Sequence, residues 1–424
     1  MRRRRSLSAA LVAGLLTLAC GGVRPEVKAA LTGSLPELQQ EIARAQQGGA
    51  LDRERLRQLG HAVAEREIAG AEGADGALQL AVFRPCLSEL EVALDERAAR
   101  GDEVAAVATL LLFEAGKRPA PDLVSRYQEA DSGAFRALAA HASLAPEQAD
   151  LRRRYFTDPD ERVRRGAFEA AQKAPFSSDL ADLLEAARLD PSPANRARAA
   201  QAVGRIGTEP AVLGLLDLFT AGDEQEQLAV LDAWSEPPSF RRGGERELAH
   251  ALNRSGLVSV SAATLLMRSP DSRAAAVAVL AHAIAEGSDD ERRVALMAAP
   301  LGEPSVREAL EKGAKNPSPE LTPLVLSRLL ELPAAAAQAR AKLEKLAQDK
   351  SDYGLEANYE LARLGSTGAV TRVEQELSHE RAGRRLRAAL TLAGLGKLQH
   401  LAPRLADKDP LLRATLACRL AEER

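Results

Sequence analysis

Two consecutive copies of one pattern, between Asp158 and Leu218, constrain the fold of this chain most strongly. The first copy reads DPDERVRRGAFEA from residue 158, and the second reads DPSPANRARAAQAVGRIG from residue 190. In each copy an Asp-Pro pair opens the segment, an Arg follows six positions after the Asp, and small residues recur three apart. Self-similarity at a fixed period of about 32 residues is typical of helical repeat arrays. The pattern therefore predicts a solenoid of stacked helical hairpins.

Length and composition agree with an all-α array. The chain has 424 residues, whereas a single compact core rarely grows beyond about 250–300 residues. Aromatic residues make up only 3% of the chain, and β-branched residues alternate too rarely for a sheet. Alanine is abundant, and it combines the highest helix propensity with a side chain small enough for close helix packing.

The period can be followed along most of the chain through one small or apolar position in the second helix of each repeat. Its spacing averages about 31 residues, which leaves room for two three-turn helices and two short turns. We place this anchor position at Ala77, Ala106, Ala137, Ala167, Ala199, Ala229, Ala262, Ala295, Leu326, Ala357, Ala388 and Leu416.

Several residues are predicted to begin helices. Ser34 and Glu37 have the spacing of a capping box, and Asp52 can cap the next helix. Asp158, Asp190 and Asp409 each precede a Pro, so they are expected to be N-caps as well. We expect one continuous solenoid over residues 34–424, in which the two helices of residues 34–70 close the open end of the array.

The first 20 residues have the features of a targeting segment. Residues 2–5 are all Arg, and residues 7–18 form an apolar stretch that is too short to span a bilayer. The sequence Thr17-Leu18-Ala19-Cys20 resembles the lipobox of bacterial lipoproteins, although the third position before the Cys is Thr17 where a Leu is usual. The resemblance implies a signal peptide over residues 1–19 and acylation of Cys20, followed by a tether over residues 20–33.

A lipidated Cys20 would anchor the protein in the bacterial cell envelope, with the periplasmic face of the outer membrane as the expected place. An ordinary secretory signal cleaved nearby is the alternative, and it implies a periplasmic or secreted protein. Beyond residue 20 no apolar run approaches membrane length. Without residues 1–19 the chain has 53 Lys and Arg against 60 Asp and Glu. Because nucleic-acid binders are usually basic, we expect no nucleic-acid partner.

The repeat resembles a known family. The repeat opens with an Asp-Pro pair, continues with an Arg six positions after the Asp and with two small residues, and is followed by Ile/Leu-Gly and Ala-Val. This pattern resembles HEAT repeats. The short period resembles the HEAT-like subtype first named for phycobilisome lyases. The match covers most of residues 70–424 and is strongest over 155–220 and 350–420. It implies a right-handed α-solenoid of about 11–12 repeats. It also implies a structural ladder between adjacent repeats, formed by the pairs Asp158/Arg164, Asp190/Arg196 and Asp407/Arg413.

Two cysteines remain once Cys20 is assigned to the lipid. Cys86 and Cys418 are about ten repeats apart, which corresponds to roughly 100 Å at ~10 Å per helix layer. A disulfide requires Cα atoms within ~7 Å, so an extended array excludes a bridge within the chain. We therefore expect two buried thiols, with pairing of Cys418 between molecules as the alternative.

No pattern in the sequence specifies catalysis. The six His are scattered at one per repeat or fewer, and no zinc-protease, P-loop, nucleotide-binding or nucleophile-elbow motif occurs. We expect no metal site, no cofactor and no catalytic constellation.

Two segments are candidates for partner contact. Residues 152–165 are rich in Arg, and residues 234–244 break the repeat with the only Trp, a Pro-Pro pair and two Arg. In the alternative interpretation these Arg are ordinary surface residues and the Trp belongs to the core of its helix. The candidate contact residues are Arg152, Arg153, Arg154, Arg164, Arg165, Trp234, Phe240, Arg241 and Arg242.

These observations predict a non-catalytic scaffold that binds a protein or peptide along the solenoid surface, as a monomer that reaches the membrane only through its N-terminal lipid. One alternative is an enzyme of lyase or transferase type acting on a chromophore or cofactor, as the name of the HEAT-like subtype suggests. Another is binding of an anionic ligand through the Arg-rich segment 152–165.

Overall fold

The computed structural model of the chain describes residues 23–49, 51–235, 244–315 and 317–422. These residues form helices and connecting turns, with no strand among them. Each of the twelve predicted anchor positions falls in a different helix, so the period read from the sequence is confirmed. None of the described helices is both long and apolar enough to cross a bilayer.

The chain divides into two compact units. Unit 1 combines the N-terminal part of the chain up to Ala115 with the C-terminal part from Thr371, and unit 2 is Gly116–Val370. Helix α25 (Thr367–Glu376) spans the boundary between them.

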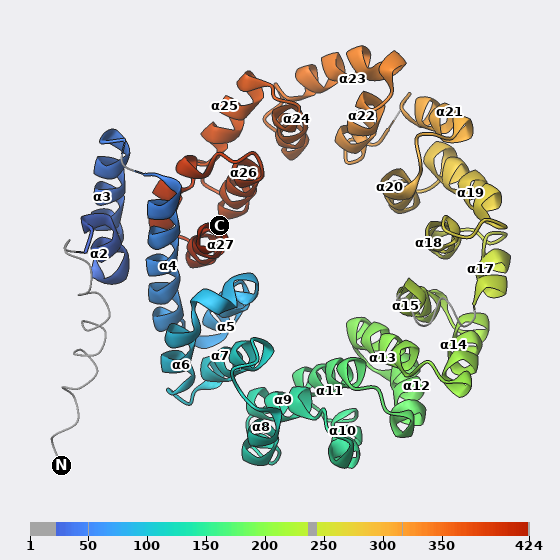
Figure 1. The fold of residues 1–424 in the computed structure, drawn as a ribbon. Coiled ribbons are helices and arrows are strands. Elements are labelled where there is room, and N and C mark those ends of the chain that lie inside the picture. Colours follow the sequence, from blue (N-terminus) through green and yellow to red (C-terminus); the bar gives the residue numbers. More distant parts are fainter. Residues whose placement is uncertain (1–22, 50, 236–243, 316, 423–424) are drawn as a thin grey trace. The chain divides into compact units, whose positions relative to one another are not determined.

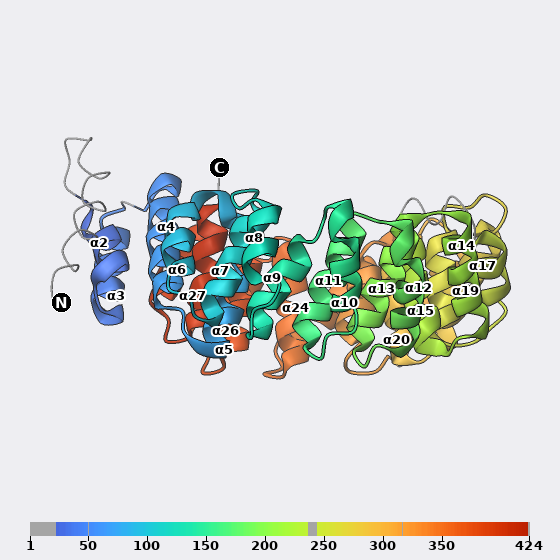
Figure 2. The ribbon, with the colours of Figure 1, turned by 90° about the horizontal axis from the view of Figure 1, so that it is seen from below.

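Unit 2 is a stack of helical hairpins in two layers, and each hairpin packs against the next (Figures 1 and 2). The first helices of the hairpins are α8 (Ala120–Tyr127), α10 (Ala149–Tyr155), α12 (Leu180–Leu189), α14 (Glu209–Ala221), α17 (Glu245–Ala251), α19 (Arg273–Glu286), α21 (Pro304–Gly313) and α23 (Pro333–Leu346). The second helices are α9 (Gly133–Ala142), α11 (Glu161–Lys173), α13 (Pro193–Ile206), α15 (Glu224–Ser235), α18 (Leu257–Leu266), α20 (Asp289–Ala298), α22 (Thr322–Leu330) and α24 (Asp352–Arg363). The short 3-10 helices η2 (Pro146–Gln148) and η3 (Ser177–Asp179) precede α10 and α12.

Small residues allow consecutive second helices to pack closely. On α11, Ala167 and Ala170 are fully buried. Gly166 on the same helix faces α9, where an added Cβ would lie 2.9 Å from the carbonyl oxygen of Ala137. A side chain at this position would therefore push the two helices apart, which explains a Gly in the middle of a helix.

Unit 1 contains both ends of the described chain. Its N-terminal elements are α2 (Pro25–Thr32), α3 (Leu35–Gln47), α4 (Arg53–Gly70), α5 (Gly73–Ala81), η1 (Arg84–Glu89), α6 (Glu91–Ala98) and α7 (Glu103–Glu114). Its C-terminal elements, besides the end of α25, are α26 (Ala382–Gly394), η4 (Leu398–His400), η5 (Ala402–Ala406) and α27 (Pro410–Ala421).

The N-terminal helices begin where the sequence predicts. Ser34 and Glu37 form the capping box of α3, and the Asp52 side chain accepts a hydrogen bond from the amide of Arg55 at the start of α4. Part of the expected tether, residues 25–32, is helical instead, because Ala29 and Ala30 are buried and α2 packs on α4.

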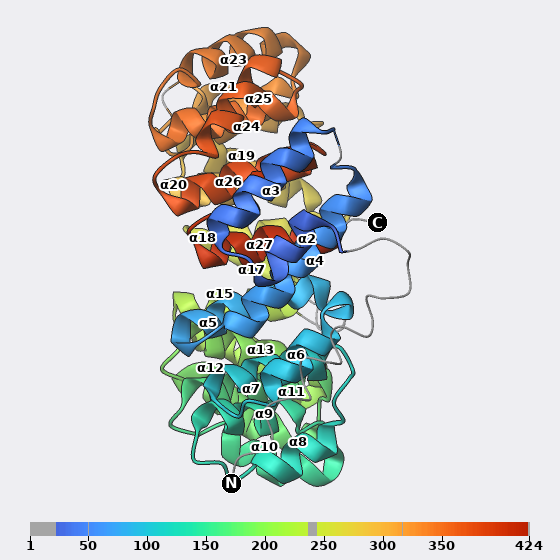
Figure 3. The same cartoon turned by 90° about the vertical axis from the view of Figure 1, so that its left-hand side faces the viewer.

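Helices α4 and α27 lie side by side, and we call this contact the joint (Figures 1 and 3). Gly60 of α4 faces α27 so closely that an added Cβ would lie 2.7 Å from the Leu420 Cβ and 2.8 Å from the Ala417 carbonyl oxygen. The absence of a side chain at Gly60 thus allows close helix packing, as it does at Gly166 between α11 and α9. Helix α4, the second of the helices expected to cap the array, thus packs on α27 of the C-terminal part of unit 1.

Helix α3 lies outside the joint and contacts η5, which precedes α27 (Figure 3). The Gln46 side chain donates a hydrogen bond to the Gln399 carbonyl (3.0 Å), and the Gln399 side chain donates to the Leu51 carbonyl (3.4 Å). Helix α3 and the turn that follows it are thus hydrogen-bonded to the C-terminal part of unit 1, while α2 packs on α4.

The glycine at the joint gives a direct test of its packing. We expect Gly60→Ala to lower the free energy of unfolding by about 1–3 kcal/mol, because the added methyl group overpacks the contact with α27. Gly70→Ala is the matched control, since Gly70 ends the same helix and nothing lies within 4 Å of an added Cβ. Urea unfolding with the disulfide intact measures both. Equal stability of the two variants would contradict a close contact at Gly60.

Candidate functional site

The predicted ladder is built around arginines near the start of the second helices. In unit 2, Arg164 Nη1 donates to the Asp158 carbonyl of its own repeat (2.8 Å). Its Nε donates to the Asp190 carboxylate of the following repeat (2.8 Å). Because a guanidinium carries donors on several sides in a fixed plane, one Arg can bind two turns at once.

The aspartates of the ladder organise the turns that they occupy. The Asp158 carboxylate accepts a hydrogen bond from the Asp160 amide, and the Asp190 carboxylate accepts one from the Ser192 amide (2.8 and 2.9 Å). Asp158 and Asp190 therefore do not cap their helices as expected, and α11 and α13 begin after Asp160 and Ser192 instead. Asp409, the third Asp that precedes a Pro, does cap its helix, α27.

The same arrangement occurs at neighbouring positions of unit 2. Arg136 donates to the Ala130 carbonyl (3.0 Å) and to the Asp158 carboxylate (3.2 Å). Arg196 donates to the Asp190 carbonyl (2.8 Å) and to the side-chain oxygen of Gln225, an amide in place of the usual carboxylate. In each case the carbonyl acceptor lies six residues before the Arg, and the side-chain acceptor belongs to the next repeat.

Unit 1 continues the ladder. Arg385 donates to the His379 carbonyl (2.9 Å) and forms two hydrogen bonds with the Asp407 carboxylate (2.7 and 2.8 Å). Burial by itself would raise the pKa of Asp407. The hydrogen bonds from Arg385 and from the Asp409 amide, with the charges of Arg385 and Arg404, outweigh burial and hold that pKa below its ordinary value.

The ladder crosses the joint at Arg413. Its Nη1 donates to the Asp407 carbonyl (2.7 Å), as the pattern requires. Its Nε and Nη2 donate to the two carboxylate oxygens of Glu67 on α4 (2.7 and 2.9 Å). Gln79 on α5 donates to the same carboxylate (2.6 Å). Glu67, 346 residues before Arg413, thus takes the place of the aspartate of a following repeat.

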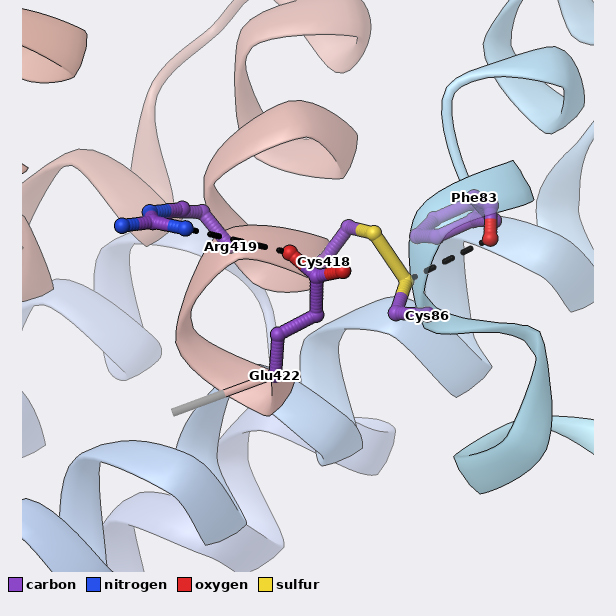
Figure 4. The surroundings of a disulfide bond; sticks show 5 residues. All are labelled: Phe83, Cys86, Cys418, Arg419 and Glu422. Atoms are coloured by element: carbon purple, nitrogen blue, oxygen red, sulfur yellow. Dashed lines mark hydrogen bonds and ion pairs between the residues drawn. A yellow bond between two sulfur atoms is a disulfide. The ribbon is translucent and has the colours of Figure 1, made fainter. Parts of the chain in front are cut away.

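A disulfide between Cys86 and Cys418 also joins the two ends of unit 1 (Figure 4). The two Cα atoms are 5.6 Å apart, although the residues are 332 positions apart in sequence. The expectation that the chain contains no internal bridge is wrong, because it assumed an extended array and so placed η1 far from α27. The Cys86 sulfur also lies 3.5 Å from the Phe83 carbonyl oxygen, which it could bind only as a thiol.

The Arg-rich segment 152–165 is not a free basic surface. Arg152 is fully buried, where it pairs with Asp179 and donates to the Ser143 and Ala174 carbonyls. Burial lowers the pKa of the Arg152 guanidinium and raises the pKa of the Asp179 carboxyl, against the attraction between them. Arg152 is therefore a structural residue, which corrects its assignment to partner contact.

The other arginines of this segment have different surroundings. Arg153 pairs with Asp150, and Arg164 belongs to the ladder, so part of their charge is compensated locally. Arg154 on α10 and Arg165 on α11 are exposed, but these two helices belong to different layers. The structure does not bring the five candidate arginines together as one patch.

Trp234 lies in the core of unit 2 with 1% of its surface exposed. Its ring packs 4.9 Å from the ring of Phe219, and Gly244 lies so close that an added Cβ would be 2.9 Å from the indole. Trp234 therefore completes the core of its repeat and is not a contact residue, which corrects that prediction. Phe240, Arg241 and Arg242 lie outside the described residues, as does Cys20.

Two residues of the ladder, Arg385 and Glu67, and one of the joint, Gly60, are not among the sequence predictions. Arg385 could have been found, because it precedes anchor Ala388 by three positions, as Arg164 precedes Ala167. Glu67 and Gly60 carry no repeat signature, so no local signal identifies them. In the described part of the chain, no group of His, Cys, Asp and Glu is arranged to hold a metal ion.

The contribution of the ladder to stability can be tested at Arg164, with the adjacent Arg165 as a control. We expect Arg164→Ala to lower the free energy of unfolding by about 2–4 kcal/mol, because the Asp190 carboxylate and the Asp158 carbonyl lose a mostly buried partner. Arg165→Ala, at the exposed adjacent position, should change it by less than about 0.5 kcal/mol. Urea unfolding compares the two. A structural ladder at this position is refuted if both variants are as stable as the parent.

Comparison with known proteins agrees with this geometry. Residues 149–233 match the family model described as HEAT repeats. None of the curated proteins matches the chain. The matched segment contains Asp158, Arg164, Asp190 and Arg196, which belong to the ladder. Residues 149–233 are thus similar to HEAT repeats, and the stacked helical hairpins of unit 2 agree with that similarity.

Proposed function

We propose that this protein is an exported, lipid-anchored scaffold without catalytic activity, and that the second helices of unit 2 bind a protein or peptide partner. HEAT repeats are in general modules of protein interaction, which supports a protein partner. The ladder charges are engaged in packing between repeats, so they are not available as a catalytic group.

The observation that carries the proposal is that several second helices carry exposed side chains. On α20 the buried residues Ala295 and Leu296 face the core, whereas Arg293 and Met297 point away from it. Met297 is 74% exposed, and a flexible thioether adapts to the shape of a partner. Further exposed residues of the second helices are Arg165, Arg205, Asp232 and Arg363.

An exported location is supported by the disulfide. Stable disulfides are rare in the reducing cytosol and common in periplasmic and secreted proteins. The bond between Cys86 and Cys418 therefore agrees with the basic and apolar N-terminal segment and with the lipobox-like sequence that ends at Cys20.

We expect Met297→Asp to weaken partner binding at least about fivefold, because a charge replaces apolar contact area on the proposed surface. Leu189→Asp is the matched control, since Leu189 is 70% exposed but lies on a first helix, α12. Partner recovery from membrane extracts of the source organism, quantified against both variants, measures the effect. Equal loss of partner in the two variants would place the binding surface elsewhere.

Lipidation is tested separately. Metabolic labelling with a radioactive fatty acid should label the parent chain and leave Cys20→Ala unlabelled, since acylation requires that thiol. Membrane fractionation should show Cys20→Ala released into the soluble fraction. Equal labelling of the two chains would contradict the lipoprotein assignment, and it would not bear on the scaffold proposal.

A further inference from the structure

We propose that unit 1 binds a small apolar zwitterion, either a free amino acid or a dipeptide, in a pocket beside α3, α25 and η5. In the bound state the carboxylate of the ligand pairs with Arg404, its ammonium group pairs with Glu374, and its side chain packs on an apolar wall. The scaffold function proposed above uses the second helices of unit 2, so this site is independent of it.

The pocket, which we call the α3–η5 pocket, has the size and lining of a small-molecule site. Its volume is about 360 Å³, and sites for small molecules commonly measure roughly 300–1,000 Å³. Leu51, Leu377 and Pro403 provide apolar lining, and Leu51 and Leu377 are buried. The charged lining includes Arg404 and Glu374. An apolar wall with a few polar groups is typical of pockets that orient a small ligand.

Two hydrogen bonds connect the walls of the α3–η5 pocket. The Gln46 side chain donates to the Gln399 carbonyl (3.0 Å), and the Gln399 side chain donates to the Leu51 carbonyl (3.4 Å). All three residues line the pocket, and α3 packs on η5 beside them. The walls are therefore held in place by the protein itself, so a ligand does not have to order them.

Arg404 brings to the pocket a positive charge that the protein neutralises incompletely. Its guanidinium lies 4.0 Å from the Asp407 carboxylate, which is too far for a hydrogen bond. That carboxylate already accepts two hydrogen bonds from Arg385 (2.7 and 2.8 Å) and one from the Asp409 amide (3.0 Å). One negative charge thus serves two guanidinium groups, and the local balance leaves one positive charge.

The Arg404 side chain is also partly removed from water. Its Nε is buried and has no hydrogen-bond partner among the described residues. Burial lowers the pKa of the Arg404 guanidinium, the charge of Asp407 opposes this shift, and the charge of Arg385 adds to it. The side chain is still 27% exposed, so a ligand in the pocket can reach it. A carboxylate supplies the acceptors that this guanidinium lacks, and it can accept two of its N–H groups at once.

Glu374 adds a negative charge to the same pocket. Its carboxylate lies 3.5 Å from Nδ1 of His400, which also lines the pocket. A neutral imidazole donates a single hydrogen bond and leaves the negative charge in place. The pocket therefore presents one cation and one anion. A zwitterion complements both charges, whereas Glu374 would repel a phosphate.

The apolar lining selects among zwitterions. Glycine has no side chain to place against Leu51 and Leu377, whereas leucine removes an isobutyl group from water there. We therefore expect leucine to bind roughly tenfold or more tightly than glycine.

Calorimetric titration of the full chain with its disulfide intact tests the site. Leucine and leucyl-leucine are the probes, and we expect at least one of them to bind with a Kd of about 1 mM or lower. Binding of one alone identifies which source of zwitterion fits. N-acetylleucine lacks the ammonium group and leucinamide lacks the carboxylate, so each should bind at least about fivefold more weakly than leucine. Absence of binding by both probes, or tighter binding of inorganic phosphate, would overturn the proposal.

Two variants test the assigned residues. Arg404→Gln should weaken binding of the better probe at least about tenfold, because the carboxylate loses its partner. Lys408→Gln makes the same charge change at an exposed residue that does not line the pocket, so it should bind as the parent does. Circular dichroism checks the folding of each variant. Equal affinity of folded Arg404→Gln and Lys408→Gln would contradict the carboxylate site.

Glu374→Gln tests the ammonium site independently of Arg404. It should lower the affinity for the better probe relative to that for N-acetylleucine, because only the probe has an ammonium group to lose its partner. This ratio decides the assignment even if Arg404→Gln does not fold. A ratio equal to that of the parent would show that Glu374 does not bind the ammonium group.

Discussion

One hydrogen-bonding arrangement recurs between repeats at Arg136, Arg164, Arg196, Arg385 and Arg413. A guanidinium binds the carbonyl six residues before it and the side chain of the following repeat, as Arg164 does with Asp158 and Asp190. These groups are largely removed from water, so the desolvation cost offsets much of their attraction, and the pairs add little net stability. Their effect is on geometry. A rigid planar donor that must satisfy two fixed turns permits only one offset between neighbouring hairpins.

Local signals in the sequence were sufficient for the repeat itself. The anchor positions and the caps at Ser34 and Asp52 all depend on residues within a few positions of one another, and all agree with the structure. Asp158 and Asp190 belong to the ladder, but they do not cap their helices as the Asp-Pro pairs predict. An Asp two residues before the N-cap can accept from the amide of that N-cap residue, and its carboxylate then also binds the arginine of the preceding repeat.

Contacts between distant segments gave no comparable signal. The bond between Cys86 and Cys418 and the pairing of Glu67 with Arg413 each join segments more than 300 residues apart, and no local pattern in the sequence points from one segment to the other. Clustered charges were misleading for a related reason. Arginines that are adjacent in sequence, such as Arg152 and Arg153, meet different acids on different elements, so their proximity along the chain does not make a basic surface.

The joint also determines which part of the chain can fold last. Hairpins of residues 116–370 find their packing partners within the adjacent repeats, so they can fold as they emerge during synthesis. Helix α4 is made early, yet the surface around Gly60 has no cover until residues 410–421 exist. A chain released before that point therefore retains an apolar helix face near its N-terminus. The close packing at Gly60 thus makes the last helix of the described chain a requirement for burying one of its first helices.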